Sequence, residues 1–423
     1  MTKTTKFKNT EIGLIPEDWH VKPIETVLDK IIDYRGKTPR KSDCGVKTLS
    51  ARSVKNGHID YSQAYHISED TFKQWVVRGK PEIGDILMTT EGPLGVIAKL
   101  DRDDVAIAQR LLTLRVKPDI LDNNFLMYYL MSKIGQHQLS SRATGTTVQG
   151  IKQSEFRKIL IAVPPIIEQK KIGKIIVDLD SKIELLKKQN VTLEKLGQTI
   201  FKQWFVDFEF PNKENKPYES SGGKMIESEL GEIPEGWENN PLKSIFKFIK
   251  GKKPIQISET KEDGFVAQIL IENLDGKDPV YTNPNRLVNV EFNDPVMVMD
   301  GASSGRIEIG FEGALGSTLA KLSVEKKEYT SVLYYYLKYF EKDIKQNTTG
   351  TSIPHTDKNK VYNYFIAIPN DLSLITIFNN SSLKIINKII GNKTLLKTLQ
   401  KTRDLLLPKL ISGQIRVPLE VKK

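Results

Sequence analysis

The feature that most constrains the fold is an internal repeat that runs through almost the whole chain. Residues 11–24 (EIGLIPEDWHVKPI) and 229–242 (ELGEIPEGWENNPL) share Gly, Ile, Pro, Glu and Trp at a constant offset. Further pairs of segments follow in the same order: residues 34–42 and 249–258, 85–95 and 294–305, 106–117 and 314–325, and 143–165 and 348–369. Because a period of about 200 residues is too long for a solenoid, we expect each copy to form a domain with its own core.

Composition narrows the class of protein. A chain of 423 residues with 39% hydrophobic residues is typical of a globular protein with two or three domains. No stretch reaches the roughly 18–20 apolar residues that span a membrane, and no apolar segment follows the basic N-terminus as in a signal peptide. The single cysteine, Cys44, excludes a disulfide framework and favours a reducing compartment. The sequence therefore predicts a cytoplasmic protein with no membrane partner.

Each copy predicts an α+β (mixed α/β) domain. Residues 85–90, 95–100 and 111–116 are short β-rich runs separated by Gly, Pro and Asp. Residues 122–139 predict one N-capped amphipathic helix, and residues 328–344 predict its counterpart in the second copy. We interpret the tyrosines of these helices as core packing rather than as a platform for stacking bases.

Each copy ends in a long helical segment with a heptad pattern. Pro164 and Pro165 stand just before the first segment, and Pro369 just before the second. The seam positions alternate in steps of four and three residues. They are Ile172, Ile176, Leu179, Ile183, Leu186, Asn190, Leu193, Gly197, Ile200 and Trp204, then Ile375, Phe378, Ser382, Ile385, Ile389, Asn392, Leu396, Leu399, Arg403, Leu406 and Leu410. We expect two helices of about 40 residues, each about 60 Å long.

The heptad pattern alone does not decide which helix packs against each seam. A parallel homodimer satisfies it, and so does a simpler antiparallel pair within one chain, because a domain between the helices can return the chain. In the antiparallel arrangement Asn190 and Asn392 fall at the same level, and we expect their side chains to approach within one helical turn. A polar pair of this kind costs stability but fixes register. The alternative is that one or both asparagines face solvent.

The motif search favours a binding protein over an enzyme. The chain has no phosphate-binding G-x-x-x-x-G-K-[ST] loop, no glycine-rich cofactor loop and no G-x-S-x-G nucleophile motif. It also lacks the Asn/Asp-Pro-Pro-aromatic tetrad of amino-methylating DNA methyltransferases, and no nuclease-like carboxylate pair with a lysine stands out. One Cys and five scattered His make a zinc site an unfavourable interpretation, so we predict neither cofactor nor metal.

A net charge of +11 and a pI near 9.2 raise the question of a polyanionic partner. Lysine and arginine neutralise phosphates and release counterions, which favours nucleic acid. Ordinary solubility is the alternative explanation, since many enzymes are basic. Charge by itself therefore leaves the partner undecided.

Short, polar, repeated loops supply the candidate DNA contacts. Arginine and lysine can contact phosphates or guanine edges, and threonine and serine can contact either. The Thr-Gly-Thr segments also offer hydroxyls and backbone N–H groups that suit an anion or a base edge. The candidates in the first copy are Tyr34, Arg35, Lys37, Thr38, Arg40, Lys41, Arg52, Thr89, Thr90, Arg110, Thr144, Thr146 and Thr147. Those in the second copy are Lys250, Lys252, Lys253, Ser303, Ser304, Arg306, Thr349, Thr351, Ser352 and His355.

Structural roles remain open for these loops: a solvated hairpin with ordinary surface charge at residues 34–42, and turn or capping motifs at the Thr-Gly-Thr segments. Arg35→Ala or Lys37→Ala is expected to weaken DNA binding if the first loop contacts DNA, and to leave affinity unchanged if it is structural. Gln149-Gly150 and Pro354-His355 differ beside the shared Thr-Gly-Thr, where two readers of different targets are expected to diverge.

The ordered set of motifs resembles the specificity subunits of type I restriction–modification systems. The resemblance rests on GLIPEDW, GKTP, TGTTVQGI, IAVPPIIEQKKIGKII, FKQWFVDFEFP and SGGKMIESELGEIPEGW, and it covers almost the whole chain. In the second copy, PNDLSLITIF replaces PPIIEQKKIG, so the Glu-Gln after the prolines is missing. That departure puts exact symmetry of methylation-subunit docking in question.

The resemblance implies a division of the chain into functional parts. Residues 1–162 and 229–367 would be target recognition domains, and residues 163–209 and 368–412 would be spacer helices that hold the domains apart as an antiparallel coiled coil. Residues 210–228, rich in polar residues, glycine and proline, would be an exposed linker, and residues 413–423 a C-terminal tail.

The resemblance also implies the role. Such a subunit has no catalytic activity of its own, reads a bipartite site in double-stranded DNA, and docks two methylation subunits, onto which restriction subunits assemble. Two divergent readers on a stiff helical pair would make the bipartite site a geometric consequence. The rival interpretations are a free-standing sequence-specific DNA-binding regulator and a coiled-coil scaffold whose basic charge is incidental.

Overall fold

The computed structural model describes residues 5–34, 38–229, 231–350 and 352–418, and the chain divides into two compact units. Unit 1 comprises residues 1–183 and 399–423, and unit 2 comprises residues 184–398. Each unit therefore contains a globular part and segments of both long helices. Among the described residues, no helix combines the length and the apolar character that a membrane crossing requires.

The elements of unit 1 follow the predicted order of strands and then helix. They are β1 (Phe7–Thr10), β2 (Gly13–Pro16), β3 (His20–Pro23), α1 (Ile24–Val27), β4 (Leu28–Asp33), β5 (Val46–Leu49), β6 (Val54–Lys55), β7 (His58–Ile59), β8 (Tyr65–Ile67), α2 (Glu69–Trp75), β9 (Ile86–Thr89), β10 (Ile97–Lys99), β11 (Val105–Ile107), β12 (Leu111–Val116), α3 (Asn123–Met131), α4 (Lys133–Ser141), α5 (Gln153–Phe156) and β13 (Leu160–Val163), after which α6 (Ile166–Phe205) begins.

The elements of unit 2 repeat this order. They are β14 (Met225–Ser228), β15 (Gly231–Pro234), β16 (Trp237–Pro241), β17 (Phe246–Lys250), β18 (Val266–Ile269), α7 (Ile271–Leu274), β19 (Tyr281–Thr282), β20 (Asn289–Val290), β21 (Val296–Val298), β22 (Ile307–Glu308), β23 (Gly313–Leu315), β24 (Leu319–Val324), α8 (Thr330–Gln346), α9 (Lys358–Tyr362), β25 (Phe365–Pro369) and α10 (Leu372–Ile411).

The central sheets of the two units have the same topology, as expected for a duplication. Strands of the first sheet follow the order β10-β9-β12-β4, and those of the second follow β17-β24-β21-β22, which is the same order read from the other edge. All neighbours in both sheets are antiparallel. The runs predicted at residues 85–90, 95–100 and 111–116 form β9, β10 and β12. The mixed α/β class is thus confirmed.

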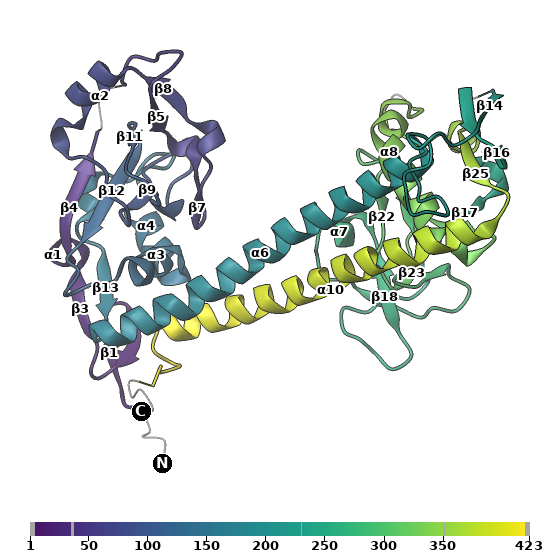
Figure 1. Ribbon diagram of the computed structural model, residues 1–423. Helices are drawn as coiled ribbons and strands as arrows, with labels where there is room; N and C mark the ends of the chain where they lie inside the picture. The colour runs from purple at the N-terminus through teal and green to yellow at the C-terminus, as the bar shows by residue number, and fades with distance from the viewer. Residues whose placement is uncertain (1–4, 35–37, 230, 351, 419–423) are drawn as a thin grey trace. The chain divides into compact units, whose positions relative to one another are not determined.

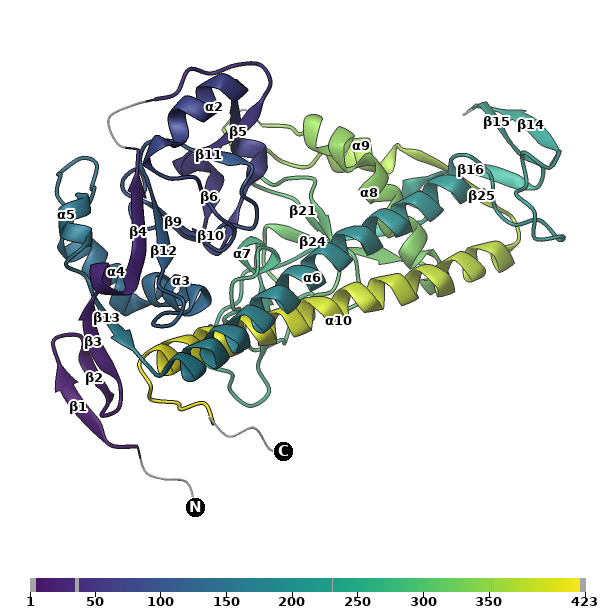
Figure 2. The same ribbon diagram turned by 60° about the vertical axis from the view of Figure 1, so that its left-hand side comes forward.

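The two long helices are confirmed at 40 residues each. In both units their segments lie side by side and run in opposite directions (Figures 1 and 2). In unit 2, Phe378 packs on Trp204 near one end of the pair, and Nδ2 of Asn392 donates to Oδ1 of Asn190, 2.9 Å away. In unit 1, Arg403 pairs with Asp180 at 2.9 Å. The predicted antiparallel asparagine pair is therefore confirmed, and the predicted seam positions are all buried or half-buried.

The prediction of a single helix at residues 122–139 is wrong in one respect. Asp122 caps it as expected, accepting from the N–H of Phe125 at 3.0 Å, but the chain bends at Ser132 and forms two helices. The Ser132 hydroxyl accepts from the N–H of Gly135 and so starts α4. The bend packs Gly135 so closely that a Cβ there would lie 2.3 Å from the Tyr129 carbonyl oxygen. Five tyrosines of α3 and α8 are core residues, as predicted, whereas Tyr339 of α8 is 40% exposed and departs from that prediction.

The predicted exposed linker also needs correction at its start. Residues 212–224 are largely exposed, but Phe210 is buried and stacks on Trp237, with ring centroids 5.0 Å apart. Phe205 and Phe208 pack on the same tryptophan. The end of α6 and the chain that follows it therefore belong to the core of unit 2.

The C-terminal tail, which follows α10, packs on unit 1 in the way that the chain after α6 packs on unit 2. Arg416 donates to Glu168 and Asp18 at 2.7–2.9 Å, and the Glu168 carboxylate also accepts from Nε1 of Trp19. Glu168 and Gln169 are both fully buried, and Gln169 bonds the backbone of Ile120, Asp122 and Pro164. The Glu-Gln pair that the second copy lacks is thus part of the interior of unit 1.

Candidate nucleic-acid interface

Loops from distant parts of the sequence meet at one end of the central sheet in unit 1. The N–H of Thr90, just past β9, donates to the Arg110 carbonyl at 2.9 Å, and the N–H of Ile151 donates to the Thr90 carbonyl at 3.0 Å. Glu91 and Gly150 form an antiparallel bridge. These bonds hold the β9–β10 loop, the turn before β12 and the Thr-Gly-Thr loop in one place.

The Thr-Gly-Thr loop is closed by its own backbone. The N–H groups of Thr144 and Gly150 each donate to the other residue's carbonyl, at 2.8 and 2.9 Å. Gly145 has φ +105°, and a Cβ at this position would lie 2.4 Å from the Val148 carbonyl oxygen. Glycine is therefore required here both for its conformation and for space. The loop exposes Thr144, Thr146 and Thr147.

Arg110 and Thr38 lie at this junction, and further cationic side chains of unit 1 are exposed. Nε of Arg110 lies 2.7 Å from a carboxylate oxygen of Glu91, and Arg110 has the left-handed φ of 71° that non-glycine residues rarely adopt. Thr38 accepts from Nε2 of Gln109 at 2.9 Å, which brings the loop after β4 to the same turn. Lys41 lies 5.0 Å from the centre of the Tyr65 ring. Arg40, Lys41 and Arg52 are exposed.

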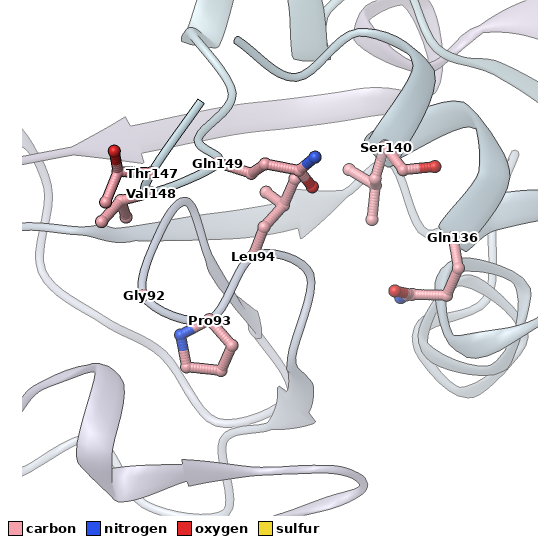
Figure 3. A pocket seen from close by; sticks show the side chains of 9 residues that line it. Gly92, Pro93, Leu94, Gln136, Ser140, Thr147, Val148 and Gln149 are labelled. Atoms are coloured by element: carbon pink, nitrogen blue, oxygen red, sulfur yellow. The ribbon is translucent and has the colours of Figure 1, made fainter. Parts of the chain in front are cut away.

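Two shallow hollows lie against the Thr-Gly-Thr loop. One, of about 310 Å³, brings together Thr90, Glu91, Gln109, Arg110, Thr144 and Lys152 with Val148. The other, of about 370 Å³, lies between the Gly92–Pro93 turn, residues 147–149 and the face of α4 that carries Gln136 and Ser140 (Figure 3). Both hollows are open and mixed in polarity, which suits the edge of a polymer more than an enclosed small molecule.

Unit 2 has the same junction with different side chains. The N–H of Met299 donates to the Thr318 carbonyl, and the N–H of Thr356 donates to the Met299 carbonyl, both at 2.8 Å. Asp300 and His355 form the bridge that Glu91 and Gly150 form in unit 1. Gly350 has φ +90°, and a Cβ there would lie 2.4 Å from the Ile353 carbonyl oxygen.

An acidic residue again holds basic ones at the centre of the unit 2 junction. The Asp300 carboxylate lies 2.9 Å from Nζ of Lys250 and 2.7 Å from Nδ1 of His355. Although partial burial raises its pKa, hydrogen bonds from Lys250 and His355 outweigh that effect and hold the Asp300 pKa below its ordinary value. Lys252, Lys253, Thr349 and Ser352 are exposed nearby in sequence, and Ser303 is half-buried.

Five predicted contact residues have structural roles instead. Tyr34 is buried, stacks on Trp75 and donates to the Gly79 carbonyl. Thr89 and Thr90 are buried at the end of β9, and the Thr89 hydroxyl accepts from the Val96 N–H.

The other two lie in unit 2. The buried Ser304 hydroxyl donates to backbone carbonyls, including that of Pro354 at 2.8 Å. Arg306 is mostly buried between Asp275 and Glu308. The five side chains are thus engaged in contacts within the fold.

Arg35, Lys37 and Thr351 lie outside the described residues, so the predictions for them stay as stated. Residues that the sequence argument missed are Glu91 and Asp300, which organise the two junctions, and Gln109, which joins two loops. Their signal was present: Glu91-Gly92 and Asp300-Gly301 occupy the same register of the repeat. In the described ranges, no group of three or more His, Cys, Asp or Glu is placed to hold a metal ion.

Comparison with known proteins gives the family. The model of the type I restriction modification DNA specificity domain matches residues 16–195 and 234–401. The chain is 28% identical to the type I restriction enzyme MjaIX specificity subunit of Methanocaldococcus jannaschii, over 98% of this chain and 97% of that protein. It is 23% identical to the HindI specificity subunit of Haemophilus influenzae, over 86% and 94% of the two chains.

A solved structure supports the fold. The crystal structure of the type I restriction–modification S subunit from M. genitalium matches with a TM-score of 0.65 and 21% identity, covering 96% of this chain and 98% of that one. Each matched segment of the family model covers most of one copy of the repeat, and the two segments together span most of the sequence. The chain therefore belongs to the type I restriction–modification DNA specificity family.

Proposed function

We propose that this chain is the DNA sequence-recognition subunit of a type I restriction–modification complex, and that each unit reads one half of a bipartite site in double-stranded DNA. The observation that carries the proposal is the duplicated loop junction. Its backbone hydrogen bonds are the same in both units, whereas the side chains it exposes differ. A constant frame with variable side chains is what two readers of different half-sites need.

The charged residues of the junctions divide into two roles. Arg40, Lys41, Lys252 and Lys253 are exposed, and such side chains position a protein on the phosphate backbone. Arg110 and Lys250 are held by carboxylates, so their geometry is fixed before DNA arrives. Fixed side chains lose less conformational entropy on binding, which favours them for base-edge contacts.

The functional division of the chain is part of the proposal. Residues 1–162 and 229–367 act as target recognition domains, and residues 163–209 and 368–412 act as spacer helices that set the unread distance between half-sites. The helices dock two methylation subunits, and restriction subunits join through that assembly. Exposed apolar side chains on α6 and α10, such as Leu185, Leu196 and Leu405, support a docking role.

The chain itself performs no catalysis and needs no cofactor in this account. Methyl transfer and cleavage belong to the partner subunits, and the complex works in the cytoplasm, where the DNA is. The absence of methyltransferase and nuclease motifs in the sequence supports this division of labour.

Methylome sequencing tests the proposal directly. We expect the host to carry adenine methylation at one bipartite motif, and deletion of the coding sequence for this chain to abolish methylation at that motif alone. Reintroducing the chain restores it. If the deletion leaves every methylated motif intact, the proposal fails. Tight sequence-specific binding by the chain in the absence of methylation subunits would then favour a free-standing regulator.

A further inference from the structure

Val148 and Ile353 are aliphatic side chains at the same register of the two Thr-Gly-Thr loops. Each lies four residues after the first threonine, and their exposed fractions are 57% and 56%. The surrounding loop positions carry threonine, serine, glutamine, proline and histidine. One exposed aliphatic side chain is ordinary on a protein surface, but here an exposed aliphatic side chain is kept at the same register of both duplicated loops, although the positions next to it differ.

Backbone hydrogen bonds tether the two ends of the loop that carries each side chain. Paired hydrogen bonds of 2.7–2.9 Å close each loop, between Thr144 and Gly150 and between Thr349 and His355. The carbonyls of Val148 and Ile353 lie directly over the left-handed glycines Gly145 and Gly350. The positions of the two apolar side chains are therefore set by the loop itself.

The surroundings of Val148 are those of a polar, cationic surface. Val148 lines both hollows of unit 1, and one of them also contains Arg110 and Lys152. In unit 2 the neighbouring bridge residue His355 contacts Asp300, which holds Lys250. An apolar side chain held among cationic and polar groups is suited to an apolar feature on a nucleic acid.

DNA offers one such feature at its base edges. In the major groove, the C5-methyl group of thymine is the apolar group that distinguishes one base pair from the others. We propose that Val148 and Ile353 each contact the C5-methyl of a thymine in the half-site that its unit reads. The inference deepens the proposed function, on which it rests, by naming two specificity-determining residues and the chemical group they read.

Replacing thymine by deoxyuridine removes that methyl and leaves base pairing unchanged. The assay uses the complete complex with its methylation subunits and duplexes of the mapped site, with one thymine at a time replaced by deoxyuridine. For the native complex we expect one replacement in each half-site to weaken binding about fourfold, as for the loss of one buried carbon.

The variants assign each methyl to a side chain. Val148→Ala is expected to weaken binding to thymine DNA by a similar factor and to abolish the deoxyuridine effect in one half-site only. Ile353→Ala is expected to do the same for the other half-site. Ile83→Ala serves as the control. Ile83 is 68% exposed, but it lies before the start of β9, whereas the loop junction lies after the end of β9. Thermal melting of each variant excludes a folding defect.

Two results would overturn the inference while leaving the proposed function intact. The first is that deoxyuridine has no effect at any position in a complex that binds its site specifically. The second is that Val148→Ala weakens binding to thymine and deoxyuridine duplexes equally, as an apolar wedge between base steps would do. A native complex that shows no preference for any site would instead contradict the proposed function itself.

Discussion

At the scale of single residues, Arg110 combines a strained backbone with a defined partner. Its left-handed φ costs on the order of 1 kcal/mol, and an exposed ion pair such as the one with Glu91 returns at most about that amount. Local stability therefore gives no reason for an arginine at this position, whereas a role in binding gives one. Strain of this kind is concentrated at functional sites.

Replacing Arg110 by glycine separates the two effects. We expect Arg110→Gly to leave the thermal stability of the protein unchanged or slightly higher, because glycine accepts the backbone conformation. DNA binding by the complex is expected to weaken, with the slope of log affinity against log salt reduced by about one if the contact is to phosphate. Fluorescence anisotropy across a salt series measures both quantities.

Arg157→Ala is the matched control for Arg110. Arg157 is also a partly exposed arginine paired with a carboxylate, that of Glu25 in α1. Neither residue takes part in the hydrogen bonds that form the loop junction, and neither lines its two hollows. Its loss is expected to leave affinity and salt slope unchanged. Equal effects of the two substitutions would show that general charge, not the junction, governs binding.

Arg416 tests a second residue-scale claim, that the C-terminal tail completes unit 1. Arg416→Ala leaves the fully buried Glu168 carboxylate without its cationic partner, and breaking a buried pair typically costs about 3–5 kcal/mol. We expect a clear fall in the urea midpoint of unfolding, followed by circular dichroism. Lys409→Ala, which removes an exposed lysine from the last turn of α10, is expected to have little effect.

The partner variant at Glu168 sharpens this test. In the background of Arg416→Ala, Glu168→Gln removes the unpaired charge and is expected to restore part of the lost stability. If Arg416→Ala shifts the midpoint no more than Lys409→Ala, the tail does not stabilise unit 1 through this pair.

At the scale of elements, the long helices were predictable and the loop junctions were not. A heptad pattern held over many turns can be read from the local sequence, because the buried face of a helix pair must stay largely apolar. The same pattern placed the two asparagines at one level of an antiparallel pair, and so it also predicted the Asn190–Asn392 contact. The strands of the central sheets were found for a similar reason, because continuous apolar runs between turn residues have few other interpretations. The break between α3 and α4 depends on Ser132 and on close packing at Gly135, which periodicity does not report.

The same limit explains the errors in the candidate site. Composition and repeat position selected hydroxyl and basic side chains, but the direction of a side chain depends on tertiary packing. Tyr34 and Arg306 therefore proved to be engaged inside the fold, while the carboxylates of Glu91 and Asp300 were overlooked because a search for DNA contacts favours positive charge. Comparison of the two copies of the repeat would have identified both acids if every polar position that the copies share had been retained as a candidate site residue.

The asparagine pair gives a prediction about the helices. Asn392 is almost fully buried, so Asn190→Leu alone leaves its amide without a partner and is expected to cost about 1–3 kcal/mol. The double change Asn190→Leu with Asn392→Leu replaces a polar pair by apolar packing and is expected to recover or exceed the native stability. Urea unfolding of the three proteins measures this. A single variant as stable as the double variant would show that the hydrogen bond has no role in the seam.

At the scale of the whole molecule, α6 runs from unit 1 into unit 2 and α10 runs back. If the helices set the spacing of the half-sites, inserting four residues into each helix at matched levels adds about 6 Å to the pair. We expect the methylated motif to keep both half-sites and to gain one or two base pairs between them, as read by single-molecule methylation mapping. An unchanged spacer in a folded, active complex would refute this role.

If each unit reads its own half of the DNA site, exchange of one unit should change one half-site alone. Residues 1–161 are replaced by the corresponding segment of a related specificity subunit with a different target, and the methylated motif of the reconstituted complex is mapped. We expect one half-site to change to that of the donor while the other half stays as it was. A change in both half-sites, or in neither while the complex still methylates DNA, would show that the units do not read separate halves.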